Sequence, residues 1–155
     1  MSKNLYVELD VLMPLIREQL SSGQNVSFTP RGSSMLPMLR DGLDTVTLSP
    51  LPEKLKKYDL PLYQRENGQY VLHRIICVGE TYTCIGDHQY TYEPGVRHEQ
   101  MIAVVSGFTR KGKSFSVNDL RYRIYCCIWQ WSRGVRCFLA RVKGWACRVL
   151  FKNAK

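Results

Sequence analysis

Turn-forming residues divide the middle of this chain into short segments, and this division limits the fold more than any other feature. Between Asn25 and Val117, apolar residues occur in short continuous or alternating runs rather than at helical spacing. The dipeptide Asn67-Gly68 is a strong hairpin signal, because tight hairpin turns need positive φ angles. The pattern predicts a compact β barrel or sandwich. The expected strands cover residues 25–29, 44–48, 60–65, 70–78, 80–85, 101–109 and 114–117.

A helix is expected on each side of these strands. Over residues 4–21 one helical face gathers the apolar side chains, although Pro14 falls inside this segment and can kink or divide the helix. The apolar residues of that face are Leu5, Leu9, Leu12, Ile16 and Leu20. The predicted fold class is therefore mainly β, with an N-terminal helix and a C-terminal amphipathic helix.

The charge of the chain is unevenly distributed. Residues 1–119 contain 13 Lys/Arg and 13 Asp/Glu, whereas residues 120–155 contain nine Lys/Arg and no acid, so the net charge of +9 comes entirely from the tail. Such segregation indicates that the tail is a separate functional element. We expect two parts, a domain over residues 1–119 and a basic helical tail over residues 120–155.

Several classes of protein are disfavoured by the sequence. The N-terminus has acids within its apolar stretch and no small-residue cleavage site, which argues against a signal peptide, and no window is apolar enough to span a membrane. The six cysteines include no CxxC pair and have no metal-ligand spacing. The expectation is a cytoplasmic protein with reduced thiols and with no cofactor or metal.

Three short segments carry candidate catalytic residues in the order Ser, His, Asp. They are GSSMLPML from Gly32 to Leu39, YVLHRII around His73, and CIGDHQYTYEPGV around Asp87, the last a predicted loop over residues 86–95. A serine hydroxyl needs a base within hydrogen-bond reach, imidazole is the natural base at neutral pH, and a carboxylate fixes its tautomer. Each residue alone is more often structural, and sequence spacing does not show that they converge.

PRGSSMLPMLRDGLDTVTL resembles the nucleophile box of the signal peptidase and LexA-type serine peptidase superfamily, Gly-x-Ser-Met-x-Pro. KYDLPLYQRENGQYVLHRII, CIGDHQYTYEPGV and MIAVVSGF are similar to its later blocks, so the resemblance covers about 90 residues in consistent order. It implies that the serine before Met35, Ser34 rather than Ser33, is the nucleophile. Met35 would pack under the site and Pro37 would fix the turn. The Ser34 amide, with Gly32 or Ser33 nearby, would form an oxyanion hole.

The position of the base distinguishes subtypes within this superfamily. Most bacterial signal peptidases and LexA-type repressors use lysine, but this chain has His73-Arg74 there, as in the archaeal and endoplasmic-reticulum signal peptidases. Arginine stays protonated and cannot serve as a base. The resemblance therefore implies His73 as base. Asp87 is the expected orienting acid, and His88 and Asp59 are alternatives. Lys54, Lys56 and Lys57 have no counterpart in the family pattern.

The tail predicts a basic amphipathic helix. Its apolar arc includes Trp131, Phe138 and Trp145, and its basic half includes Arg133, Arg136 and Arg141. Such a helix suits either an interfacial membrane contact or docking on the domain or a partner, and the pattern does not choose between them. No nucleic-acid partner is expected, because no segment resembles a known binding motif.

Three functions follow from these observations. The leading one is a serine endopeptidase that removes a leader or signal segment from a peptide or protein substrate. A LexA-like self-cleaving or partner-binding regulator ranks lower, because only about 24 residues precede the core and no Ala-Gly bond occurs in the chain. A non-catalytic scaffold is the third.

Overall fold

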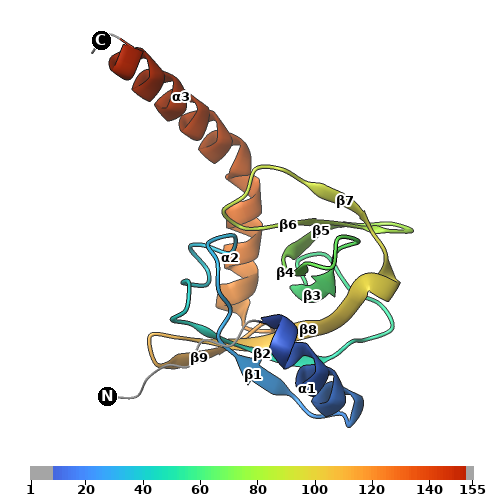
Figure 1. Cartoon of the computed structure of the whole chain (residues 1–155). Helices are drawn as coiled ribbons and strands as arrows, with labels where there is room; N and C mark the ends of the chain where they lie inside the picture. Colours follow the sequence, from blue (N-terminus) through green and yellow to red (C-terminus); the bar gives the residue numbers. More distant parts are fainter. Residues whose placement is uncertain (1–8, 153–155) are drawn as a thin grey trace. The chain divides into compact units, whose positions relative to one another are not determined.

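The computed structural model describes residues 9–152, with side chains from residue 9 to residue 142. It is mainly β, with an N-terminal helix and C-terminal helices, so the predicted fold class is confirmed (Figure 1). The chain forms two compact units, Met1–Asp119 and Leu120–Lys155. The boundary between them coincides with the position after which acidic residues cease.

The larger sheet has six strands in the order β1-β2-β8-β3-β4, with β9 pairing to β8. All of its pairings are antiparallel. The long strand β8 lies at its centre and is bonded to β2, β3 and β9. The strands are β1 Val26–Phe28, β2 Thr45–Pro50, β3 Pro61–Gln64, β4 Tyr70–Leu72, β8 Met101–Arg110 and β9 Lys113–Ser116.

The smaller sheet has the order β5-β6-β7, also antiparallel. Its strands are β5 Arg74–Val78, β6 Tyr82–Ile85 and β7 Glu93–Val96, and the short helix η1 His98–Gln100 follows. The sequence pattern predicts one strand over residues 70–78 and a loop over residues 86–95. Instead, the first is divided at His73, and β7 lies within the second. His73 therefore joins the two sheets.

The hairpin turn between β3 and β4 forms where Asn67-Gly68 predicts it. The Gly68 amide donates to the Arg65 carbonyl and the Arg65 amide donates to the Gln69 carbonyl. Of the two residues Asn67 and Gly68, only Gly68 takes a positive φ, of 86°. Asn67 instead uses its side-chain oxygen to accept from the Gln69 amide at 3.1 Å, so its role differs from the one that the dipeptide rule assigns.

Helix α1, Leu9–Ser21, contributes to the core of the larger unit. It buries Met13, Ile16 and Leu20, while Leu12 is only half-buried, so the buried face is rotated from the expected one. Leu5 lies outside the described residues. The helix runs through Pro14, the sixth of its 13 residues, which is exposed and whose missing N–H removes one intrahelical bond.

An apolar cluster draws side chains from both sheets and from the loop between β2 and β3. Its members are completely or almost completely buried: Leu55, Tyr63, Val71, Ile75, Tyr82, Cys84, Val96 and Met101. Because the cluster draws on both sheets, its packing fixes where the end of β4 meets the start of β5. This junction is the position of His73.

The tail consists of two helices, α2 Leu120–Trp131 and α3 Arg133–Lys152. Ser132 lies between them, and backbone bonds from Ser132 to Ile128 and from Arg136 to Ser132 carry the helical pattern across it. Within residues 9–152, no helix is both long and apolar enough to cross a membrane.

The tail residues expected to contact a membrane or partner differ in their surroundings. Trp131 and Phe138 are exposed, as is Arg141. Arg136 lies over the Trp129 ring, with its guanidinium carbon 3.4 Å from the ring centroid. Arg133, expected on the same basic half, is buried and does not present its charge to solvent. The Trp145 side chain lies outside the described side chains.

Candidate active site

Ser34 lies in the turn that leads from β1 toward β2, at the wall of a cleft of about 1040 Å³. His73 lines the same cleft, so the structure brings these two predicted residues to one cavity. Ser34 is half-buried. In the part of the chain that the structure describes, neither its amide nor its hydroxyl has a protein hydrogen-bond partner. Both groups remain available to a bound substrate.

The backbone of Ser34 is fixed by the loop that follows β6. The His88 amide donates to the Ser34 carbonyl at 2.8 Å. Gly86 approaches so closely that a Cβ built on it would lie 2.6 Å from the same carbonyl oxygen. Only glycine fits this approach, because real Cβ atoms do not come that near to an oxygen. The Gly86-Asp87 loop is thus part of the support of the serine.

The residues expected to support the nucleophile surround it in the turn. Gly32, Ser33 and Met35 line the cleft with Ser34, and Met35 is buried. Pro37 is exposed and follows a cis peptide bond with Leu36. The Gly32 amide donates to Asp41 Oδ1 at 2.9 Å, so of the three expected contributors the amides of Ser33 and Ser34 are the candidate oxyanion donors.

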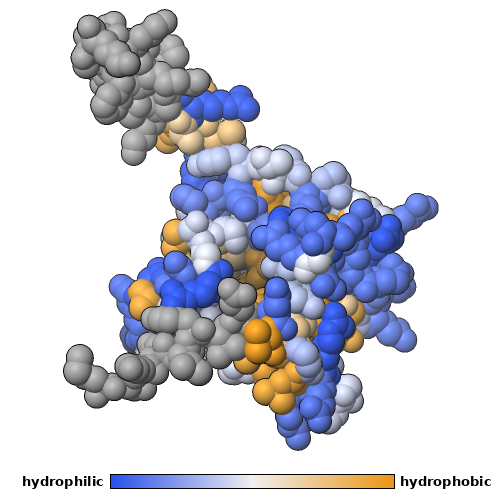
Figure 2. All heavy atoms as spheres, in the orientation of Figure 1, coloured by the Kyte–Doolittle hydropathy of each residue, from blue (hydrophilic) through white to orange (hydrophobic). Residues whose placement is uncertain are grey.

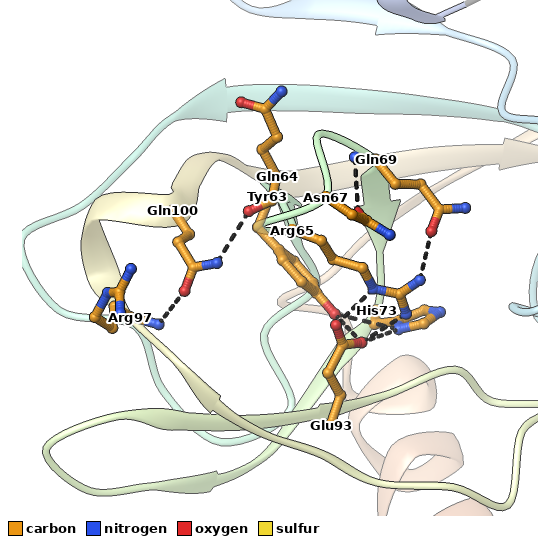
Figure 3. Close-up of polar contacts among 9 residues, drawn as sticks. All are labelled: Tyr63, Gln64, Arg65, Asn67, Gln69, His73, Glu93, Arg97 and Gln100. Carbon is orange, nitrogen blue, oxygen red and sulfur yellow. Dashed lines mark hydrogen bonds and ion pairs between the residues drawn. The ribbon is translucent and has the colours of Figure 1, made fainter.

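His73 is buried, and its Nδ1 edge faces two oxygen atoms (Figure 3). The Tyr63 hydroxyl oxygen lies 3.3 Å from Nδ1 and Glu93 Oε2 lies 3.4 Å from it. Tyr63 donates its own hydrogen to Glu93 Oε2 at 2.6 Å. With that hydrogen committed, both oxygens facing Nδ1 are acceptors. Nδ1 is therefore the nitrogen that carries hydrogen, and Nε2 keeps its lone pair.

Glu93 is held in place by Arg65. Arg65 Nε donates to Oε1 at 2.6 Å and Nη2 donates to Oε2 at 2.8 Å, a bidentate pairing, while Nη1 binds the Gln69 side chain. Burial would raise the pKa of Glu93, but the hydrogen bonds from Arg65 and Tyr63 outweigh it and hold that pKa below its usual value. The carboxylate that faces His73 is therefore ionised at neutral pH.

The electrostatic surroundings keep His73 uncharged. Burial lowers the pKa of His73 to about 4, and the positive charge of Arg65 acts in the same direction, while Glu93 opposes both. At neutral pH the ring is therefore neutral, with its Nδ1–H facing the Tyr63 hydroxyl oxygen and Glu93 Oε2. This is the state that a general base needs before the reaction begins.

The structure does not place Asp87 in the role expected of it. Its two carboxylate oxygens accept from Arg74 Nε and Nη2, each at 2.8 Å, and both side chains are fully buried. Arg74 also donates to the Tyr58 carbonyl. The acid next to His73 Nδ1 is Glu93. Asp87 instead anchors the loop that supports Ser34 on strand β5.

The alternative residues lie elsewhere or have other partners. Asp59 accepts from the Lys56 amide at 2.7 Å. His88 is exposed and lines the cleft, and its amide is the one bonded to Ser34. Lys54, Lys56 and Lys57 are exposed and do not line the cleft.

Three residues at the site, Tyr63, Arg65 and Glu93, are not found by reasoning from sequence. Glu93 falls in a predicted loop, 20 positions after His73, where a Gly-Asp pair is the more obvious signal. The available signal is in strand 60–65, where Tyr63 and Arg65 alternate onto one face.

Within the described residues, no group of three or more His, Cys, Asp or Glu side chains is arranged to hold a metal ion. Comparison of the chain with protein-family models, curated proteins and solved structures finds no match.

Proposed function

We propose that this chain is a serine endopeptidase of the signal peptidase-like class that removes a leader or signal segment from a peptide or protein. Ser34 is the nucleophile, His73 the general base and Glu93 the acid that orients it. The observation that carries this proposal is the hydrogen-bond arrangement at His73, a residue that lines the same cleft as Ser34: Nδ1 faces the Tyr63 hydroxyl and Glu93, so Nε2 is the nitrogen that keeps its lone pair.

In the acylation step, Ser34 Oγ attacks the carbonyl carbon of the scissile bond, and His73 Nε2 takes the hydroxyl proton. The resulting imidazolium donates its Nδ1–H to the Glu93 carboxylate, which stabilises the new positive charge. The Ser34 amide donates to the developing oxyanion. His73 then gives its proton to the leaving amine. A water molecule, activated by the same Nε2, hydrolyses the acyl-enzyme.

The cleft supports an apolar peptide as substrate. Apolar side chains from both edge strands of the larger sheet line it, from Phe28 at the end of β1 to Val71 and Leu72 on β4. Leader and signal segments present an apolar stretch followed by small residues at the cleavage site. Such a stretch would bury its side chains along the cleft and present the scissile carbonyl to Ser34.

The experiment compares cleavage of a mixture of synthetic leader peptides, with the new termini identified by mass spectrometry. Ser34→Ala and His73→Gln should abolish cleavage, because members of such a group act as a unit. Ser33→Ala and His88→Gln are matched controls, since both residues line the same cleft and should remain active. Full activity in Ser34→Ala, or equal loss in Ser33→Ala, would falsify the assignment.

We also place the protein in the cytoplasm, with a peripheral contact to the membrane. The free thiols of Cys77, Cys84, Cys127 and Cys137 support a reducing compartment.

A further inference from the structure

The tail helices carry an exposed apolar face made of Ile124, Ile128, Trp131, Val135, Phe138 and Val142. All six side chains are between 44% and 88% exposed, and Trp131 is the most exposed. At 100° per residue they fall within an arc of about 80°. Along the helix the face extends about 27 Å at 1.5 Å per residue. Figure 2 shows apolar atoms on the described part of α3, next to the atoms drawn in grey.

Cationic and aromatic side chains flank this exposed apolar face on both sides. By helical angle, Arg123 and Arg141 lie along one edge, and both are exposed. Along the other edge, Tyr125 stacks on Trp129, with centroids 5.8 Å apart, and Arg136 lies over the Trp129 ring. Aromatic rings with a polar group prefer the boundary between water and hydrocarbon, and arginine stems extend along apolar surface toward water.

The charge of the tail identifies what would cover this face. Residues 120–155 contain nine Lys/Arg and no Asp/Glu. A second copy of the tail has no acids to offer these cations, so self-pairing would bring like charges together. An anionic lipid surface complements the cations and accepts the apolar side chains at the same time.

We propose that the exposed apolar face of α2 and α3 binds the surface of an anionic lipid bilayer, with the helices lying in the interface. Ile124, Trp131 and Phe138 enter the boundary of the acyl chains. Arg123 and Arg141 remain at the level of the headgroups. This would bring the larger unit, with its proposed active site, to the surface of the bilayer.

The test is co-sedimentation of the full chain with vesicles. It uses the Ser34→Ala variant, so that it does not depend on the proposed peptidase activity. The chain should bind vesicles of phosphatidylcholine and phosphatidylserine, bind phosphatidylcholine alone much more weakly, and dissociate as salt is raised. Trp131→Asp with Phe138→Asp should weaken binding at least ~10-fold, since each removes a large apolar side chain from the interface.

Leu43→Asp is the matched control, because Leu43 is 68% exposed but lies in the larger unit. It should leave binding unchanged. Circular dichroism of each variant checks that the helices are retained. We expect them to be, because the substituted side chains are exposed. The proposal is overturned if the chain ignores both kinds of vesicle, or if the paired substitution leaves binding intact. It is also overturned if light scattering shows that the face joins two copies while no lipid is bound.

Discussion

Gly86 and Ser34 meet so closely that no side chain can stand between them: a Cβ on Gly86 would lie 2.6 Å from the Ser34 carbonyl oxygen. The contact connects the loop after β6 of the smaller sheet to the turn that carries Ser34. The Ser34 backbone is therefore positioned by a glycine 52 residues later in the chain.

Gly86→Ala should displace the Ser34 backbone and lower kcat at least ~10-fold, because a misplacement of about 1 Å at a reacting group has effects of this size or greater. Activity on the leader peptide that the wild type cleaves is the measurement. Gly79→Ala is the control, since the atom nearest to its added Cβ is 3.7 Å away, an ordinary contact. If the two variants were equally active, the close approach would have no role in catalysis.

Glu93 and Arg65 should move the pKa of His73 in opposite directions. The charge of Arg65 lowers that pKa and the charge of Glu93 raises it. Arg65→Gln should therefore raise the pKa of His73 above the wild-type value of about 4, and Glu93→Gln should lower it further. NMR titration of the imidazole protons measures both shifts. Shifts of the same sign would contradict the assigned arrangement.

Stability should depend on pH through His73. Its pKa is about 4 in the folded chain, whereas an unfolded histidine titrates near 6.5. Between these values the unfolded chain binds the proton and the folded chain does not, so stability falls as the pH is lowered from 6.5 to 4. The full loss is about 3 kcal/mol. Urea unfolding at a series of pH values measures it, and His73→Gln should remove most of this slope.

Substitutions of Asp87 and Glu93 should have different effects on stability and activity. Asp87→Asn leaves the buried Arg74 guanidinium without its anion, which should lower the free energy of unfolding by about 3–5 kcal/mol. Glu93→Gln, at a partly exposed pair, should destabilise the chain much less and act mainly on kcat. Denaturant unfolding measures the loss of stability in each variant, and an activity assay at low temperature measures the loss of catalysis separately. An Asp87→Asn variant with normal stability and no activity would return Asp87 to the catalytic role.

The sequence predicts the elements of this fold better than the details of its site. Alternation and turn residues locate most strands to within a few residues, because both depend on local chemistry. These two signals do not predict the division at His73. Residues 71 to 75 are all buried, and no turn residue separates them, so their pattern predicts one continuous strand. Whether such a segment stays in one sheet or passes from one sheet to another depends on tertiary packing, here that of the apolar cluster drawn from both sheets.

The sequence also does not predict which acid lies next to His73, for a related reason. Asp87 follows a glycine in a loop, and Glu93 lies only six residues later, so spacing does not favour one over the other. The two arginines determine the difference: Arg74 pairs with Asp87, and Arg65 pairs with Glu93. Both are pairings between distant segments. Ser34 and His73, by contrast, belong to motifs whose residues are adjacent in the chain.

His73 belongs to neither sheet, and this has a consequence for newly made chains. On the proposed mechanism, Ser34 precedes β2 of the larger sheet, while Glu93 begins β7 of the smaller one. A chain in which only one sheet has formed lacks either an anchored nucleophile or an oriented base. If the chain has the proposed activity, that activity would therefore depend on both sheets having formed, and an incompletely folded copy would lack it.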